Sequence, residues 1–323
     1  MNNNALPSPE MYRPEFEDRY QHEYQQTVAR AEGLVDKCVV GGEYREFPIL
    51  AKTNATRKVR GRFEETAPDT VSSGKRRIET TAYINPLIFD RKDEMKFGTL
   101  ESQIGPSIQN QRAESARNMD ATIVGVAGER GGLIGQAIQV DEQGAVSYPE
   151  FDDVNRTIAA NYAFGTTGGS NVGLTYDKIL NLKTRLGKLN VISQDASTNN
   201  PSALGLLIGY SQIEQLLHDD RIANLDFASS KLEQVAEGKI VDLLGFSIKA
   251  MDDDVLPFDS GNNLRTCVAF AKNAAKFGYN ETQTFELDRL PSKSHAIQSV
   301  CYWDWGLGRI MDEGVWKVQC LEE

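Results

Sequence analysis

The most regular spacing of apolar residues in the chain lies between residues 107 and 127. The stripe recurs at gaps of 8, 3, 4 and 3 residues and consists of Ile108, Ala116, Met119, Ile123 and Val126. Gaps close to 3.6 residues place side chains on one face of a helix, so the spacing predicts a helix over Ser107–Ala127. Pro106 suits its first position, because the missing N–H would be unpaired there. Arg112 is the one polar residue on the stripe.

The rest of the pattern mixes helices and strands. Helical spacing predicts helices over Glu15–Val40 and Thr175–Leu186, and Ala203–Asp219 is expected to form either a helix or a strand followed by a helix. Short apolar or alternating runs predict strands at Ala137–Val140, Leu189–Ser193, Leu264–Ala271, Thr284–Leu287, Ala296–Trp305 and Val315–Leu321. Lys239–Ile248 is expected to form a buried strand pair or a strand with a turn. Turns are expected at Gly306–Gly308 and Asp312–Gly314. The order of these elements favours an α+β fold.

A long two-stranded ribbon is expected between residues 46 and 89. Phe47–Phe63 is extended in character, residues 65–75 form a turn-rich tip, and Ile78–Phe89 alternates as the return strand. An isolated two-stranded hairpin is marginally stable in water and has open edges. Something must therefore cover this ribbon, either its own domain or another subunit.

The ribbon is basic, whereas the whole chain has a net charge of −11. Between Glu46 and Arg77 there are four acidic and eight basic residues, which gives a net charge near +4. The basic ones are Lys52, Arg57, Lys58, Arg60, Arg62, Lys75, Arg76 and Arg77. Complementary charge would guide such a hairpin onto an acidic neighbouring subunit, and these eight residues are the candidate contacts. The alternative is a solvated hairpin folded back on its own domain.

The sequence contains few motifs that would indicate a binding or catalytic site. An acidic chain does not suit binding to the DNA backbone, and none of the four cysteines forms a CxxC pair. The N-terminus lacks the features of a signal peptide, and no apolar run approaches the ~18 residues of a membrane span. The glycine-rich segments match neither a dinucleotide fingerprint nor a P-loop, and no catalytic, cofactor-binding or metal-binding residue is predicted. A pair of catalytic carboxylates stays open, because such pairs are seldom visible in sequence.

The order of the elements resembles the major capsid proteins of tailed phages. The resemblance lies in YRPEFEDRYQHEYQQTVARAEGLV, INPLIFDRKDEM and QNQRAESARNMDATIVGVAG, the last resembling the spine helix of that family with Arg112, Arg117 and Asp120 in the usual places. GFSIKAMDDDVLP followed by RTCVAFAKNAA resembles the exit from the family's apical domain, and WGLGRIMDEGVWKVQC its closing strands. The resemblance covers most of the chain in layout.

The resemblance implies five regions. They are an N-terminal arm (1–45), an extended loop (E-loop, 46–90), a peripheral domain containing the spine helix (91–188, helix at 107–127), an axial domain (189–264) and return strands (265–323). The implied function is structural and non-enzymatic. Copies form the hexamers and pentamers of an icosahedral virion shell around double-stranded DNA, which is held without sequence-specific binding.

The implied partners are other copies of the chain, with scaffolding, portal and decoration proteins as further candidates and no membrane. Assembly is expected in the host cytoplasm. Two alternatives are a cellular nanocompartment shell of the same fold and a cytoplasmic enzyme with an unrecognised carboxylate site. The stripe of the long helix is expected to pack on the sheet of the peripheral domain, with Arg112 reaching an acidic partner at the sheet edge or on a neighbouring subunit.

Overall fold

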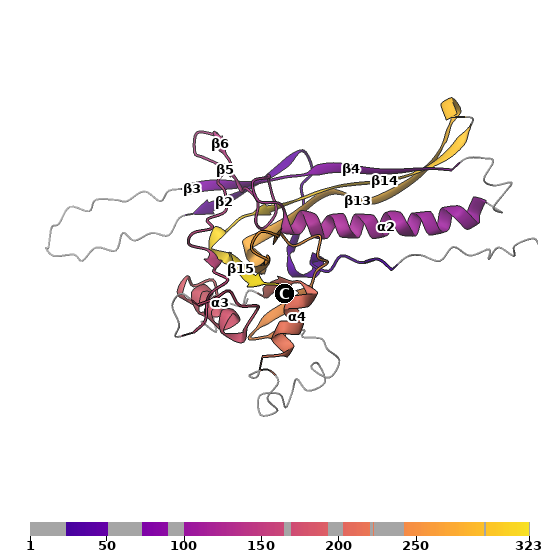
Figure 1. The fold of residues 1–323 in the computed structure, drawn as a ribbon. Helices are drawn as coiled ribbons and strands as arrows, with labels where there is room; N and C mark the ends of the chain where they lie inside the picture. Colours follow the sequence, from indigo (N-terminus) through magenta and orange to yellow (C-terminus); the bar gives the residue numbers. More distant parts are fainter. Residues whose placement is uncertain are drawn as a thin grey trace, which may run out of the picture.

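The described residues fold into three sheets and three main helices, in the α+β class that the sequence indicates. The computed structural model describes residues 24–50, 73–89, 100–164, 169–192, 203–219, 222, 242–293 and 295–322. Figure 1 shows a long sheet with helix α2 alongside it, a body below that carries α3 and α4, and a hairpin that points away from both.

The long sheet has four strands in the order β1-β13-β14-β4. Its strands are β1 (Asp36–Val39), β13 (Ala275–Leu290), β14 (Ala296–Arg309) and β4 (Thr81–Phe89), and the 3₁₀ turn η5 (Pro291–Lys293) follows β13. β1 pairs only with Lys276–Tyr279, so no described strand pairs with that edge of β13 beyond Tyr279.

The turn expected at Gly306–Gly308 is wrong, because both glycines lie within β14. A Cβ atom on Gly306 would stand 2.1 Å from the carbonyl oxygen of Glu79, and one on Gly308 would stand 2.5 Å from Ile78 Cγ1. Because these glycines have no side chain, β14 can pack closely against the end of β3, where the chain continues toward β4. The two glycines do not form a turn.

Helix α2 (Leu100–Val124) lies along the long sheet (Figure 1). The predicted helix is confirmed, but its bounds shift toward the N-terminus, and Pro106 lies inside it instead of at its start. Val126, predicted on the apolar stripe, lies beyond the last turn and is 55% exposed. The helix stops where Gly125 crosses Gly132. Both have φ above +70°, and a Cβ on either would come within 2.7 Å of the other's Cα.

The expected ribbon is divided between two sheets. β2 (Tyr44–Leu50) and β3 (Ser73–Glu79) form a hairpin whose register pairs Leu50 with Ser73. β3 also pairs with β5 (Ile138–Val140), which pairs with β6 (Val146–Ser147), so the chain itself covers one edge of the hairpin base. The prediction that Ile78–Phe89 forms one return strand is wrong. The ladder breaks at Thr80, and β4 joins the long sheet.

The body below the long sheet is built on a seven-stranded sheet. Its order is β7 (Thr157–Ile158), β15 (Val315–Leu321), β12 (Leu264–Ala271), β8 (Leu204–Ile208), β10 (Phe246–Ala250) and β9 (Asp242–Leu243), with β11 (Phe258–Asp259) paired to β12. α3 (Tyr176–Lys188) and α4 (Tyr210–Leu217) contribute Leu182 and Leu216 to its core. The 3₁₀ turn η4 (Lys272–Ala274) lies between β12 and β13, and the 3₁₀ turn η6 (Asp312–Gly314) lies between β14 and β15.

The strand predictions at Leu264–Ala271 and Val315–Leu321 are confirmed to the residue, as is the strand–helix order at 203–219. No strand forms over the described residues 189–192. At 242–250 two short strands pair around a turn, so the strand pair expected at 239–248 is confirmed for its described part.

The helix predicted over Glu15–Val40 is wrong for its described part. From Tyr24 onward the chain forms an irregular segment, the 3₁₀ turn η2 (Glu32–Leu34) and β1. Tyr24 and Val28, which would form its apolar face, are both exposed. The polar groups of this segment instead bind side chains of α2, which favours an extended path.

Candidate functional site

The face of α2 that meets the long sheet is polar. The Gln111 side chain donates to the carbonyl oxygens of Asn85 (2.8 Å) and Ser299 (3.1 Å), and the Ser299 hydroxyl donates back to it (2.9 Å). One turn and two turns further along, Ser115 and Asn118 also face the sheet. Gln283 donates to the Ser115 hydroxyl. Hydrogen bonds therefore fix the register between α2 and the sheet.

Asn118 is the acceptor for two indoles of β14. The Nε1 atoms of Trp303 and Trp305 lie 3.0 and 3.1 Å from its Oδ1 atom. Trp303 stacks on Trp305 and on Tyr83 of β4, so the aromatic cluster extends over both strands. Trp303 and Trp305 thus lie under the helix, as core.

The predicted stripe of α2 has mixed surroundings. Ile123 and Ala116 are buried, Met119 packs against the core, and Ile108 is half-buried. Arg112 is exposed on α2, and its guanidinium lies 5.3 Å from the ring centroid of Phe285 on β13. Within the described part of the chain, the contact of Arg112 is this aromatic ring. An acidic partner on a neighbouring subunit, the other expected position, stays a prediction. Burial raises the pKa of the neighbouring Cys301 thiol to about 11, and the positive charge of Arg112 opposes that shift.

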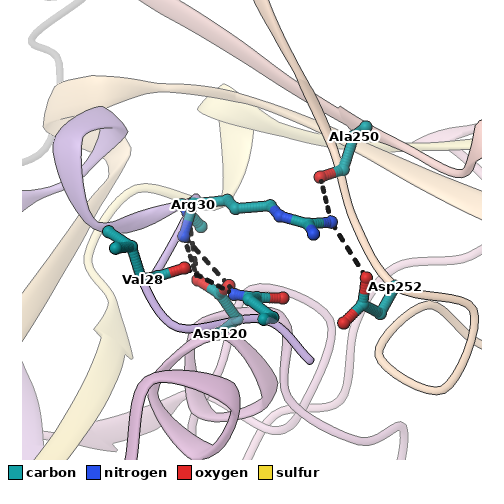
Figure 2. Close-up of polar contacts among 7 residues, drawn as sticks. Val28, Arg30, Asp120, Ala250 and Asp252 are labelled. Atoms are coloured by element: carbon teal, nitrogen blue, oxygen red, sulfur yellow. Dashed lines mark hydrogen bonds and ion pairs between the residues drawn. The ribbon is translucent and has the colours of Figure 1, made fainter. Parts of the chain in front are cut away.

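Asp120 binds the arm segment to α2 (Figure 2). Its fully buried carboxylate accepts hydrogen bonds from the backbone N–H of Arg30 (3.0 Å) and of Ala31 (3.0 Å), and from the Gln26 side chain. Burial raises the pKa of this carboxyl, and the three hydrogen bonds oppose the shift. Asp120 therefore holds the end of the arm, and Gln25 adds hydrogen bonds with Arg117 (2.9 Å) and Asn110 (2.7 Å) of the same helix.

Arg30 extends this junction into the seven-stranded body, as Figure 2 shows. Its Nη1 atom donates to the carbonyl oxygen of Ala250 (3.1 Å), at the end of β10, and to Asp252 (2.9 Å). Its guanidinium lies 5.6 Å from the Tyr210 ring of α4. The arm segment thus joins α2 to the body.

The described cations of the hairpin are paired within the chain. Glu46 on β2 accepts from Lys75 (3.1 Å) and Arg77 (2.9 Å) of β3, and these bonds, led by that of Arg77, lower the pKa of Glu46. Arg76 binds Asp312 (2.5 Å). The other five predicted contacts, Lys52, Arg57, Lys58, Arg60 and Arg62, lie outside the described residues.

Asp312 in η6 connects the three sheets. Its carboxylate binds Arg76 of β3 and Arg309 of β14, and its carbonyl oxygen accepts from Arg156 beside β7. Arg309 is almost fully buried, and two more of its bonds reach the carbonyl oxygens of Leu133 (3.0 Å) and Gly135 (2.9 Å). No feature of the sequence signalled this cluster, because its members come from four distant segments.

Buried charge elsewhere also serves structure. The ammonium group of Lys178 on α3 is buried and donates to the carbonyl oxygens of Ala160, Val172 and Gln319 at 2.8–3.0 Å. Burial lowers the pKa of this lysine. Across the part of the chain that the structure describes, no three His, Cys, Asp or Glu side chains are placed to hold a metal ion. No described helix is long and apolar enough to cross a membrane.

Together, these elements define a shell-type subunit: a long sheet backed by a helix, a compact body, a projecting hairpin and an arm. Comparison with solved structures gives the same fold. The chain matches the Cyanophage Pam1 capsid with a TM-score of 0.69 and 9% identity, covering 100% of this chain and 99% of that one. It matches the head structure of Helicobacter pylori bacteriophage KHP40 at 0.66 and 9%, with full coverage of both. A Mycobacterium phage Che8 structure matches at 0.63 and 16%, covering 98% of each.

The family model described as phage capsid protein matches residues 9–322, so this chain belongs to the phage capsid protein family. It is a major capsid protein, a structural subunit that assembles with its copies into the shell of the virion. No curated protein matches it in sequence. The matches give no support to the nanocompartment or enzyme alternatives.

Proposed function

We propose that copies of this chain form hexamers and pentamers that close into an icosahedral shell around double-stranded DNA. In this arrangement the long sheet with α2 is the peripheral domain, the seven-stranded body is the axial domain, and residues 46–90 include the extended loop. The net charge of −11 suits a wall that does not bind DNA tightly or sequence-specifically.

The proposal also includes the partners, the place of assembly and the non-enzymatic role that the resemblance implies. Scaffolding, portal and decoration proteins are further partners, assembly occurs in the host cytoplasm, and the chain has no catalytic role.

The observation that carries the proposal is an apolar face of the long sheet that points away from α2. Tyr83 contacts the tryptophans under the helix, so alternation along β4 directs Ile84 and Ile88 to the opposite face. Their exposed fractions are 57% and 45%. Large apolar side chains grouped on a sheet face are typical of a surface that another chain covers.

Charge identifies the segment that fits this face. Register places Asp288 of β13 and Ile88 of β4 on either side of Gln298, and Glu286 and Pro86 on either side of Val300, so these carboxylates border the apolar strip. Glu286 and Asp288 are exposed. The residues beyond the paired part of the hairpin include five basic residues, Lys52 to Arg62. We infer that they lie on this face of the neighbouring copy, where the charges are complementary.

The test removes the end of the hairpin and keeps its base. Because Leu50 and Ser73 are register partners, residues 51–72 can be replaced by Asn-Gly, which closes a two-residue hairpin turn. We expect a subunit with wild-type thermal unfolding that forms no closed shells in electron micrographs.

A matched variant keeps the length and removes the charge. Replacing Lys52, Arg57, Lys58, Arg60 and Arg62 with Gln should lower the assembled fraction without changing the unfolding temperature of the free subunit. Shells of normal size from the shortened chain would refute the role of the hairpin.

A further inference from the structure

A pocket of about 290 Å³ lies where the end of α3 meets the start of β15. It is lined by Asn155, Arg156, Arg185, Lys188, Leu189 and Trp316. Trp316 and Leu189 form an apolar floor, and three cationic side chains surround it. We call this site the cationic pocket.

The three cations come from two separate segments. Arg185 and Lys188 lie in the last turn of α3, where positive charge is favoured by the helix dipole, and the Arg185 guanidinium lies 5.3 Å from the Trp316 ring centroid. The dipole does not account for Arg156, which approaches from the loop before β7. Among the described residues, none of the three forms an ion pair within 4.0 Å.

The nearest acidic side chains are already engaged. Asp152 accepts from the side-chain amide of Asn155 at 2.9 and 3.2 Å, and Asp153 binds Lys317 at 2.6 Å. Because the Asn155 amide is neutral, Asp152 keeps its negative charge and attracts Arg156, which also donates to the carbonyl oxygen of Asp312. Among the described residues, the pocket cations without an acidic partner are therefore Arg185 and Lys188.

A loop whose charge is opposite to that of the cationic pocket follows β10. Asp252, Asp253 and Asp254 are consecutive, and Asp253 and Asp254 are exposed. Asp253 lies 3.9 Å from Arg265, which is held more closely by Glu322 (2.5 Å), the residue after β15. The pocket is at the start of β15 and the loop is near its end. Seven strand residues span roughly 23 Å, so the two sites of one chain cannot meet.

We propose that the acidic loop of one copy binds in the cationic pocket of the next copy. Each copy then offers a pocket on one side and a loop on another, which is the heterologous contact that builds a closed ring. This inference rests on the proposed assembly into hexamers and pentamers and names a contact within them.

A protein partner fits the pocket better than nucleic acid. Trp316 is 4% exposed and covered by Arg185, so it offers no free ring for stacking a base. Three cations around one compact pocket match a short acidic segment, whereas binding to a phosphate backbone rewards an extended row of cations.

The test is a charge reversal on each side, followed by their combination. Arg185→Glu with Lys188→Glu, and separately Asp253→Lys with Asp254→Lys, should each lower the fraction of protein in rings and shells at least about tenfold. The four-residue combination restores the charge complementarity and should recover most of the assembly. Native mass spectrometry and electron microscopy measure the assembled fraction.

The controls separate charge from folding. Arg185→Lys with Lys188→Arg keeps both charges and should assemble normally. If the double variants unfold, the pair Lys188→Glu and Asp254→Lys repeats the test with two exposed residues. Normal assembly of the single-sided variants, or no recovery in the combination, overturns the inference. If wild-type protein forms no shells, the proposed function fails instead.

Discussion

Asp120 is the residue on which the attachment of the arm depends. Its carboxylate accepts two backbone N–H groups and one side-chain amide, all from the segment before η2. A backbone N–H that is buried without an acceptor costs free energy comparable to a lost hydrogen bond, so these donors need this acceptor. The sequence marked Asp120 only through its resemblance to the spine helix, because its partners are about 90 residues away.

Asp120→Ala should lower the free energy of unfolding by about 3 kcal/mol, because it leaves several buried donors unpaired. Asp120→Asn keeps one oxygen acceptor and should fall between this variant and the wild type. Chemical denaturation of the free subunit measures both. Glu114→Ala, on the exposed side of α2, should change stability by less than about 0.5 kcal/mol. Equal stability of Asp120→Ala and the wild type would contradict the role of this junction.

At the scale of elements, the local spacing of apolar residues predicted most of the helices and strands. It could not predict the features that depend on tertiary contacts. α3 was predictable because its helical periodicity matches the side that it buries, and β12 was predictable because it is a short, largely apolar run that is buried on both faces. The spacing around residues 107–127 predicted a helix, but could not show that Gln111, Ser115 and Asn118 meet the sheet, since the matching indole and carbonyl groups belong to other strands.

Asn118→Leu tests the polar face of α2. Loss of the amide leaves two buried indole N–H groups without an acceptor, and we expect a destabilisation of about 2–3 kcal/mol. Asn118→Asp keeps an acceptor oxygen and should lose less. Urea denaturation followed by tryptophan fluorescence reports both the stability and the surroundings of Trp303 and Trp305. An unchanged midpoint for Asn118→Leu would show that packing alone holds the helix.

At the scale of the molecule, the way in which the sheets are connected could not be predicted from the sequence. Residues 46–89 were predicted as one ribbon, yet β3 and β4 belong to different sheets, because β4 pairs with β14 and Tyr83 stacks on Trp303 there. The basic hairpin was predictable from composition. The sequence could not predict that the charges of Lys75, Arg76 and Arg77 are neutralised at the base of the hairpin. Their carboxylate partners are brought close only by the fold.

Asp312→Ala should weaken all three sheets together. It leaves the guanidinium groups of Arg76 and the buried Arg309 without their carboxylate, at a cost of about 3 kcal/mol. Thermal unfolding and hydrogen exchange measure the effect, with faster exchange expected in β3. Asp153→Ala is the matched control, since it breaks an ion pair whose carboxylate is largely exposed. Unchanged exchange in β3 would show that Asp312 does not orient the hairpin.

The long sheet has two edges that no described strand covers over its outer half, and both resist pairing with another chain. β4 carries Pro86, which has no N–H to donate, and β13 carries Glu281, Glu286, Asp288 and Arg289 along its open edge. Proline and charge at strand edges prevent the strand addition that leads to aggregation. We therefore expect newly made subunits to accumulate to high concentration without pairing strand to strand and growing into fibres.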